Sequence, residues 1–238
     1  MMGSREMFFE RIDDRNPVNH RIRPEIHPRK RFLKRVAHGK PSTSQATTQP
    51  APNSMAIWTA TLKCSGNNQE DTVRILFTSD LHGMIWLYDS LVDLSEQCRP
   101  DLIILGGDLL PRLDKHGNLL DAQRHFAITV FPSYCLKMHD INPDVHIGVI
   151  LGNDDCQMVT RESEDLHRTG LIRLVDNSAW KTRHSWQVIG TSLVPETPFH
   201  LKDFERRDCE ADPVRYPSVQ AMYSSDQGIG ILSSSAWF

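Results

Sequence analysis

The stretch ILFTSDLHG at residues 75–83 decides the fold, because a buried apolar run stops abruptly at an acid and an imidazole. Asp80 and His82 follow the run two positions apart. In an extended chain, residues i and i+2 lie on the same side, so we expect both side chains to reach one common point. A carboxylate and an imidazole at one point are suited to a metal ion.

From Val73 onward, apolar runs alternate with segments whose apolar residues have helical spacing. Continuous apolar runs predict buried strands, and the helical spacing predicts helices between them. This order is typical of the α/β class, with a mainly parallel sheet covered on both faces. The expected strands are 73–79, 102–107, 145–152, 172–176 and 186–194, the expected helices are 84–97, 118–138 and 160–170, and 177–185 is a hairpin-like connection.

Polar residues follow each of the first three predicted strands. Asp108 comes after the second strand, and Asn153, Asp154 and Asp155 come after the third. Taken singly, each could be a helix cap, a turn residue or a packed core side chain. Three coincidences at three strand ends favour one shared site instead, because ligands bind beyond the carboxyl ends of parallel strands. Oxygen ligands with an imidazole suit Mn, Fe, Zn or Mg.

The motifs DLHG, GGD and GND, in this order and spacing, resemble the first three signatures of the calcineurin-like metallophosphoesterase family. The segment 193–208 is similar to bacterial-type members. The resemblance implies a partial αββα sandwich with a mainly parallel central sheet and two divalent metal ions. It implies that Asp80 and His82 hold the first metal, that Asp108 bridges, and that Asn153 holds the second.

The resemblance also implies catalytic roles for Arg112 and Asp154. Arg112 lies four residues after Asp108, where some phosphatases of the superfamily carry an arginine that grips substrate phosphate. The alternative is a surface arginine paired with Asp114 or Asp121. Asp154 stands where most members have a histidine that assists the leaving group. A carboxylate could act as a general acid there only when protonated, which an adjacent dication disfavours.

The sequence departs from the family pattern in its second half, since it contains no H-x-H and no G-H, the motifs that supply the remaining metal ligands. We therefore expect residues 71–238 to form a C-terminally truncated domain with weakened metal affinity, its exposed sheet covered by a partner chain.

Two functions stay open. The first is a metal-dependent phosphoesterase, a phosphatase or phosphodiesterase that hydrolyses a phosphate mono- or diester by a metal-bound hydroxide. The second is a non-catalytic truncated binding or regulatory module. An unrelated nucleotide-binding α/β protein is disfavoured, because G-x-G-x-x-G is absent.

Residues 1–70 are expected to be a disordered, basic and Ser/Thr/Pro-rich region. Residues 1–40 carry eleven Lys/Arg against five Asp/Glu. The basic run at 28–35 is a solvated tail, a nuclear or organelle address, or a nucleic-acid contact. The remaining chain is acidic, which argues against nucleic acid as a partner. No apolar run is long enough to span a bilayer, so we expect no membrane contact. Five cysteines cannot all pair in disulfides, so we expect an intracellular, cytoplasmic protein.

Overall fold

A five-stranded sheet in the order β2-β3-β4-β5-β6 forms the centre of the molecule. The computed structural model describes residues 8–11, 58–66, 69–112, 118–182, 186–207, 209, 216 and 219–232. Four neighbouring strands are parallel, and β2 at the edge is antiparallel to β3. The predicted α/β class with a mainly parallel sheet is confirmed. The strands are β2 (Trp58–Gly66), β3 (Gln69–Thr78), β4 (Leu102–Gly106), β5 (His146–Ile150) and β6 (Arg173–Leu174).

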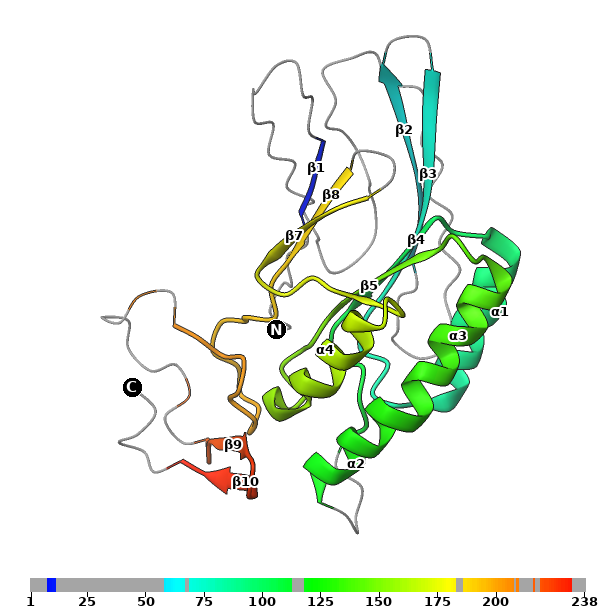
Figure 1. Ribbon diagram of the computed structural model, residues 1–238. Coiled ribbons are helices and arrows are strands. Elements are labelled where there is room, and N and C mark those ends of the chain that lie inside the picture. The colour runs from blue at the N-terminus through cyan, green and yellow to red at the C-terminus, as the bar shows by residue number, and fades with distance from the viewer. Residues whose placement is uncertain are drawn as a thin grey trace.

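Helices cover one face of this sheet, and a smaller sheet covers the other (Figure 1). On the helical face, Leu76, Ile103 and Ile147 pack in the main core with apolar residues of the helices. The opposite face carries Ile75 and Ile104, which pack with Val188 of the smaller sheet. The alternation along β3 and β4 therefore supplies two cores. The helices are α1 (Ile85–Cys98), α2 (Leu119–His125), α3 (Phe131–Ile141) and α4 (Thr160–Arg168).

The smaller sheet has the antiparallel order β1-β8-β7, and a separate hairpin pairs β9 with β10. The predicted hairpin-like connection at 177–185 contributes β7, which pairs with β8. None of the helices in the described part of the chain is both long and apolar enough to cross a membrane. The strands are β1 (Phe8–Arg11), β7 (Ser178–Lys181), β8 (Trp186–Gly190), β9 (Met222–Ser225) and β10 (Gly228–Ile231).

Two details differ from the helices expected from sequence. The single helix predicted over 118–138 is divided into α2, a π-helical turn at Phe126–Val130, and α3. Pro132 lies at the start of α3 and lacks an N–H, so the regular hydrogen-bond pattern cannot run through it. The helix expected over 160–170 ends at Arg168, and a 3₁₀ turn at Gln157–Val159 leads directly into it.

The central sheet begins before the start near Val73 that the sequence indicated. Trp58–Gly66 is a strand that pairs with β3 along its whole length, and Phe8–Arg11 pairs with β8. These two segments differ from the disordered region expected at residues 1–70. The basic run at 28–35 lies outside the described residues. The physical reason is cross-strand pairing. β2 gains its backbone hydrogen bonds from β3, so it can form a strand without an apolar core of its own.

Candidate metal centre

The loops that follow β3 and β4 are joined by a short ladder of backbone hydrogen bonds. The amide of Asp80 donates to the carbonyl of Gly107 at 2.9 Å, and that of His82 donates to Asp108 at 2.8 Å. Gly83 continues the ladder with a 2.8 Å bond to the carbonyl of Leu109. Because the two loops are held together by their backbones, their polar side chains are placed close to one another before any ligand binds.

Three polar residues of these loops have left-handed backbones. The φ angles are 61° for Asp80, 46° for His82 and 53° for Asp108. Side chains larger than glycine rarely adopt this region, and such strain clusters at functional sites. The expected proximity of Asp80 and His82 is therefore present, but its cause differs. Asp80 and His82 converge through a turn with left-handed residues, whereas extended alternation was expected.

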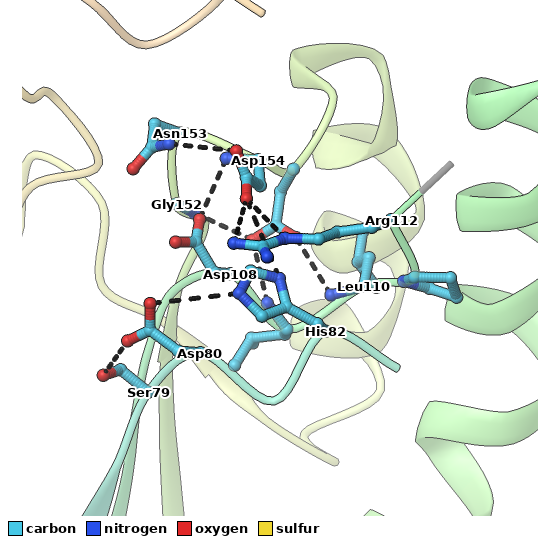
Figure 2. A network of polar contacts seen from close by, with 12 residues as sticks. Ser79, Asp80, His82, Asp108, Leu110, Arg112, Gly152, Asn153 and Asp154 are labelled. Atoms are coloured by element: carbon cyan, nitrogen blue, oxygen red, sulfur yellow. Dashed lines mark hydrogen bonds and ion pairs between the residues drawn. The ribbon is translucent and has the colours of Figure 1, made fainter. Parts of the chain in front are cut away.

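Asp80, His82 and Asp108 each offer a ligand atom, and these three atoms all lie within 4.8 Å of one another. Nε2 of His82 is 4.0 Å from Oδ1 of Asp80. Metal–ligand bonds of about 2.0–2.2 Å place two donors at most about 4.4 Å apart, so small side-chain rotations close the cluster around one cation. The donor set of two carboxylates and one imidazole therefore fits a divalent metal. Figure 2 shows the cluster.

Asn153 enters the same site from the loop after β5. Its side chain is buried, and its Nδ2 donates to Oδ1 of Asp154 at 3.1 Å. An amide oxygen, like a carboxylate, is a ligand type that divalent cations accept. The backbone N–H of Asp154 donates to Oδ1 of Asp108 at 2.9 Å. The loop after β5 thus orients the central carboxylate, and Asn153 lies on the same side of the site as Asp108 (Figure 2).

Gly152 allows this close approach between the β4 and β5 loops. A Cβ atom at Gly152 would lie 2.1 Å from Oδ1 of Asp108 and 2.3 Å from its backbone nitrogen. Neither distance is possible for real atoms, so glycine is required wherever Asp108 keeps this position. The glycine of the GND motif therefore has a packing role at the site, in addition to its place in a turn.

Arg112 and Asp154 form an ion pair beside the candidate ligands. Nε and a terminal nitrogen of Arg112 both lie 2.8 Å from Oδ2 of Asp154. The same oxygen is 3.9 Å from Nδ1 of His82. The Arg112 side chain is 61% exposed, whereas that of Asp154 is 17% exposed. The structure therefore brings together both residues predicted as catalytic, and it pairs Arg112 with Asp154. Of the two alternative partners, Asp121 lies on α2 and Asp114 lies outside the described residues.

Asp155 does not point toward the candidate ligands but binds the backbone of the site loops. It is fully buried and accepts hydrogen bonds from the amides of Leu109, Leu110 and Gly152, at 3.2, 2.9 and 2.8 Å. A buried carboxylate that accepts three N–H groups fixes the loop after β4 against the loop after β5. The sequence placed Asp155 in the strand-end group but gave no sign of this role.

Tyr88 of α1 supports the same loop from the helical side. Its hydroxyl donates to the carbonyl of Leu109 at 2.8 Å in a fully buried position. Burial raises the pKa of Tyr88 well above its ordinary value, and the negative charge of Asp155 raises it further. The tyrosine is therefore neutral and a hydrogen-bond donor over the physiological pH range.

The fold and the site together define a protein with a candidate metal-binding cluster at the carboxyl ends of a parallel sheet. A family model described as calcineurin-like phosphoesterase matches residues 73–206, which is more than half of the 238 residues. The chain belongs to the calcineurin-like phosphoesterase family.

Two further comparisons add little to the family match. The chain has no match among curated proteins. A solved crystal structure matches it with 15% identity and a TM-score of 0.35, over 46% of this chain and 48% of that one. The match therefore spans about half of that structure's length. At this score, the likeness carries no argument about function.

Proposed function

We propose that this protein is a metal-dependent phosphoesterase that hydrolyses a phosphate mono- or diester. The observation that carries the proposal is the convergence of Asp80, His82 and Asp108 on one point within the matched family region. The family supplies the substrate class, which is a phosphate ester. We propose Asp80, His82, Asp108 and Asn153 as the residues that would hold two divalent ions.

Divalent cations at these ligands would polarise the phosphoryl oxygens and make water acidic enough to serve as a nucleophile near neutral pH. The protein residues around them have separate tasks. Arg112 binds an anionic oxygen of the substrate, because a guanidinium fork fits a phosphate. Asp154 holds that fork in place and keeps it beside His82. The carboxylates gathered at the site would repel an anionic substrate. Bound cations would offset this negative charge and let the substrate bind.

The deciding experiment incubates the purified chain with Mn²⁺ and either bis(p-nitrophenyl) phosphate or p-nitrophenyl phosphate. Asp108→Asn should lower turnover by about a hundredfold or more, because it removes the shared carboxylate ligand. Asp93→Asn is the matched control, since Asp93 is an exposed carboxylate on α1. The relative rates on the two esters separate a phosphodiesterase from a phosphatase. Turnover that survives Asp108→Asn unchanged contradicts the proposal.

A second candidate is a binding or regulatory module with the same metal site but without catalysis. It is favoured by the sequence, which supplies no H-x-H or G-H motif to complete the ligand set of the family. With fewer ligands, each cation keeps open positions and affinity falls. Binding of Mn²⁺ and inorganic phosphate without turnover of either ester would favour this candidate over the enzyme.

A further inference from the structure

Gln123 is a fully buried polar residue on α2, and its carboxamide touches both loops that carry Arg112 and Asp154. Nε2 donates to the carbonyl of Pro111 at 3.0 Å and to that of Asp154 at 2.8 Å. Oε1 accepts the backbone N–H of Cys156 at 2.7 Å. One side chain therefore uses both donor hydrogens and its acceptor to join the loop after β4 to the loop after β5.

The two carbonyls held by Gln123 belong to the residue before Arg112 and to Asp154 itself. The Arg112 side chain is largely exposed, so little else around it restricts where its guanidinium lies. A fixed backbone on both sides of the ion pair limits the positions that the two side chains can reach together. Gln123 thereby acts on the ion pair through the main chain.

We propose that Gln123 is a positioning residue that holds the Arg112–Asp154 pair where an anionic oxygen of the substrate binds. The role of the Arg112–Asp154 pair in substrate binding rests on the proposed function. The effect of Gln123 on the positions of the two loops does not. The three hydrogen bonds of the Gln123 carboxamide go to the main chain of Pro111, Asp154 and Cys156. Loss of Gln123 should therefore weaken substrate binding more than metal binding, which it reaches only through the Asp154 amide that donates to Asp108.

The test uses Gln123→Met, which keeps the length of the side chain and removes all three hydrogen bonds. Gln123→Glu is the second variant, because it keeps an acceptor for Cys156 and replaces the donor group with an oxygen. The matched control is Asn118→Ala, which removes the N-cap of the same helix, where Asn118 accepts the Leu120 amide at 3.1 Å. The control lowers the stability of α2 but keeps all three hydrogen bonds by which Gln123 joins the two loops.

Hydrogen exchange measured by mass spectrometry tests the structural part without any activity. Exchange in the segments 108–112 and 152–156 should accelerate about tenfold in Gln123→Met and in Gln123→Glu. The Asn118→Ala control should not accelerate these two segments beyond the rest of the protein. Equal exchange in the control and in the Gln123 variants overturns the inference, whether or not the wild-type protein is active.

Kinetics with Mn²⁺ and bis(p-nitrophenyl) phosphate test the functional part. Gln123→Met should raise KM about tenfold with a smaller change in kcat, and Mn²⁺ affinity should fall by a smaller factor than KM rises. In an Arg112→Ala background, the same substitution should change KM by less than about twofold, because its effect passes through Arg112. A full tenfold effect in that background contradicts the inference. Absence of wild-type turnover defeats the proposed function, and hydrogen exchange then decides the role of Gln123 alone.

Discussion

Replacing Asp155 with asparagine should destabilise the protein strongly, although Asp155 lies outside the candidate ligand cluster. Oδ2 accepts the amides of Gly152 and Leu109, and Oδ1 accepts that of Leu110. An asparagine can keep its oxygen at the first position, but its NH₂ group then faces the N–H of Leu110. One hydrogen bond to a charged group is lost, and a buried donor is left without an acceptor.

The loss of one charge-assisted hydrogen bond costs about 1.5–3 kcal/mol, and weakening of the other two adds to this. We therefore expect Asp155→Asn to lower the free energy of unfolding by about 3 kcal/mol. For a domain of this size, this corresponds to a decrease in Tm of about 6–12 °C. The exposed control Asp93→Asn should stay within about 0.5 kcal/mol of the wild type.

Urea unfolding followed by circular dichroism measures both variants under identical, metal-free conditions. Metal-free buffer matters, because a bound cation would add its own stabilisation to the folded state. A cost below about 1 kcal/mol for Asp155→Asn would refute the reasoning, since it would mean that the three amides find equivalent partners without the carboxylate.

Two further substitutions test the packing of the site and the buried thiol near it. Gly152→Ala should weaken Mn²⁺ binding at least about tenfold, because its Cβ would displace Asp108. Gly170→Ala is the control: its positive φ strains an alanine, but a Cβ there meets nothing within 4 Å, so Mn²⁺ binding should stay unchanged. Equal Mn²⁺ binding in both variants contradicts the prediction. Burial raises the pKa of Cys156 from 9.0 to about 12, so the stability it contributes is complete below about pH 9 and is lost as pH rises toward 12. Cys156→Ala should reduce the alkaline loss of unfolding free energy by about 1.4 kcal/mol per pH unit. Urea unfolding between pH 8 and pH 11 measures this loss, and an equal dependence on pH in the wild type and the variant would contradict the prediction.

The strands that carry the site were predictable because each is a continuous apolar run followed by a polar residue. Asp80, Asp108 and Asn153 could be assigned to one edge of the sheet from that order alone. Parallel strands bring their carboxyl ends together whatever the details of the loops. The calcineurin-like family was predictable for the same reason, since its motifs are those strand ends.

The contacts that connect the loops were not predictable from local patterns. Arg112 and Asp154 are 42 positions apart, and Asp155 is 46 positions from Leu109. Nothing in either segment alone indicates the other as its partner. Gln123 carried one weak signal, which is a polar side chain inside an otherwise apolar helical stripe, and such a position often marks a buried hydrogen bond.

The edge strand β2 was missed for a different reason. Residues 58–66 follow a long polar segment, and they pair with β3 through a connection of only two residues, Asn67 and Asn68. The composition before them suggested disorder, although WTATLK at 58–63 alternates apolar and polar residues as a half-buried strand does. Pairing with a neighbouring strand is a tertiary effect, and it decided the structure of this segment.

Binding of Mn²⁺ to the purified protein, measured by isothermal titration calorimetry, tests most directly whether Asp80, His82 and Asp108 form a metal site. We expect the wild type to bind Mn²⁺, and Asp108→Asn to bind it at least about tenfold more weakly. The control Asp93→Asn should match the wild type. Wild-type protein that binds no Mn²⁺, or Asp108→Asn that binds it as tightly as the wild type, would contradict the metal site.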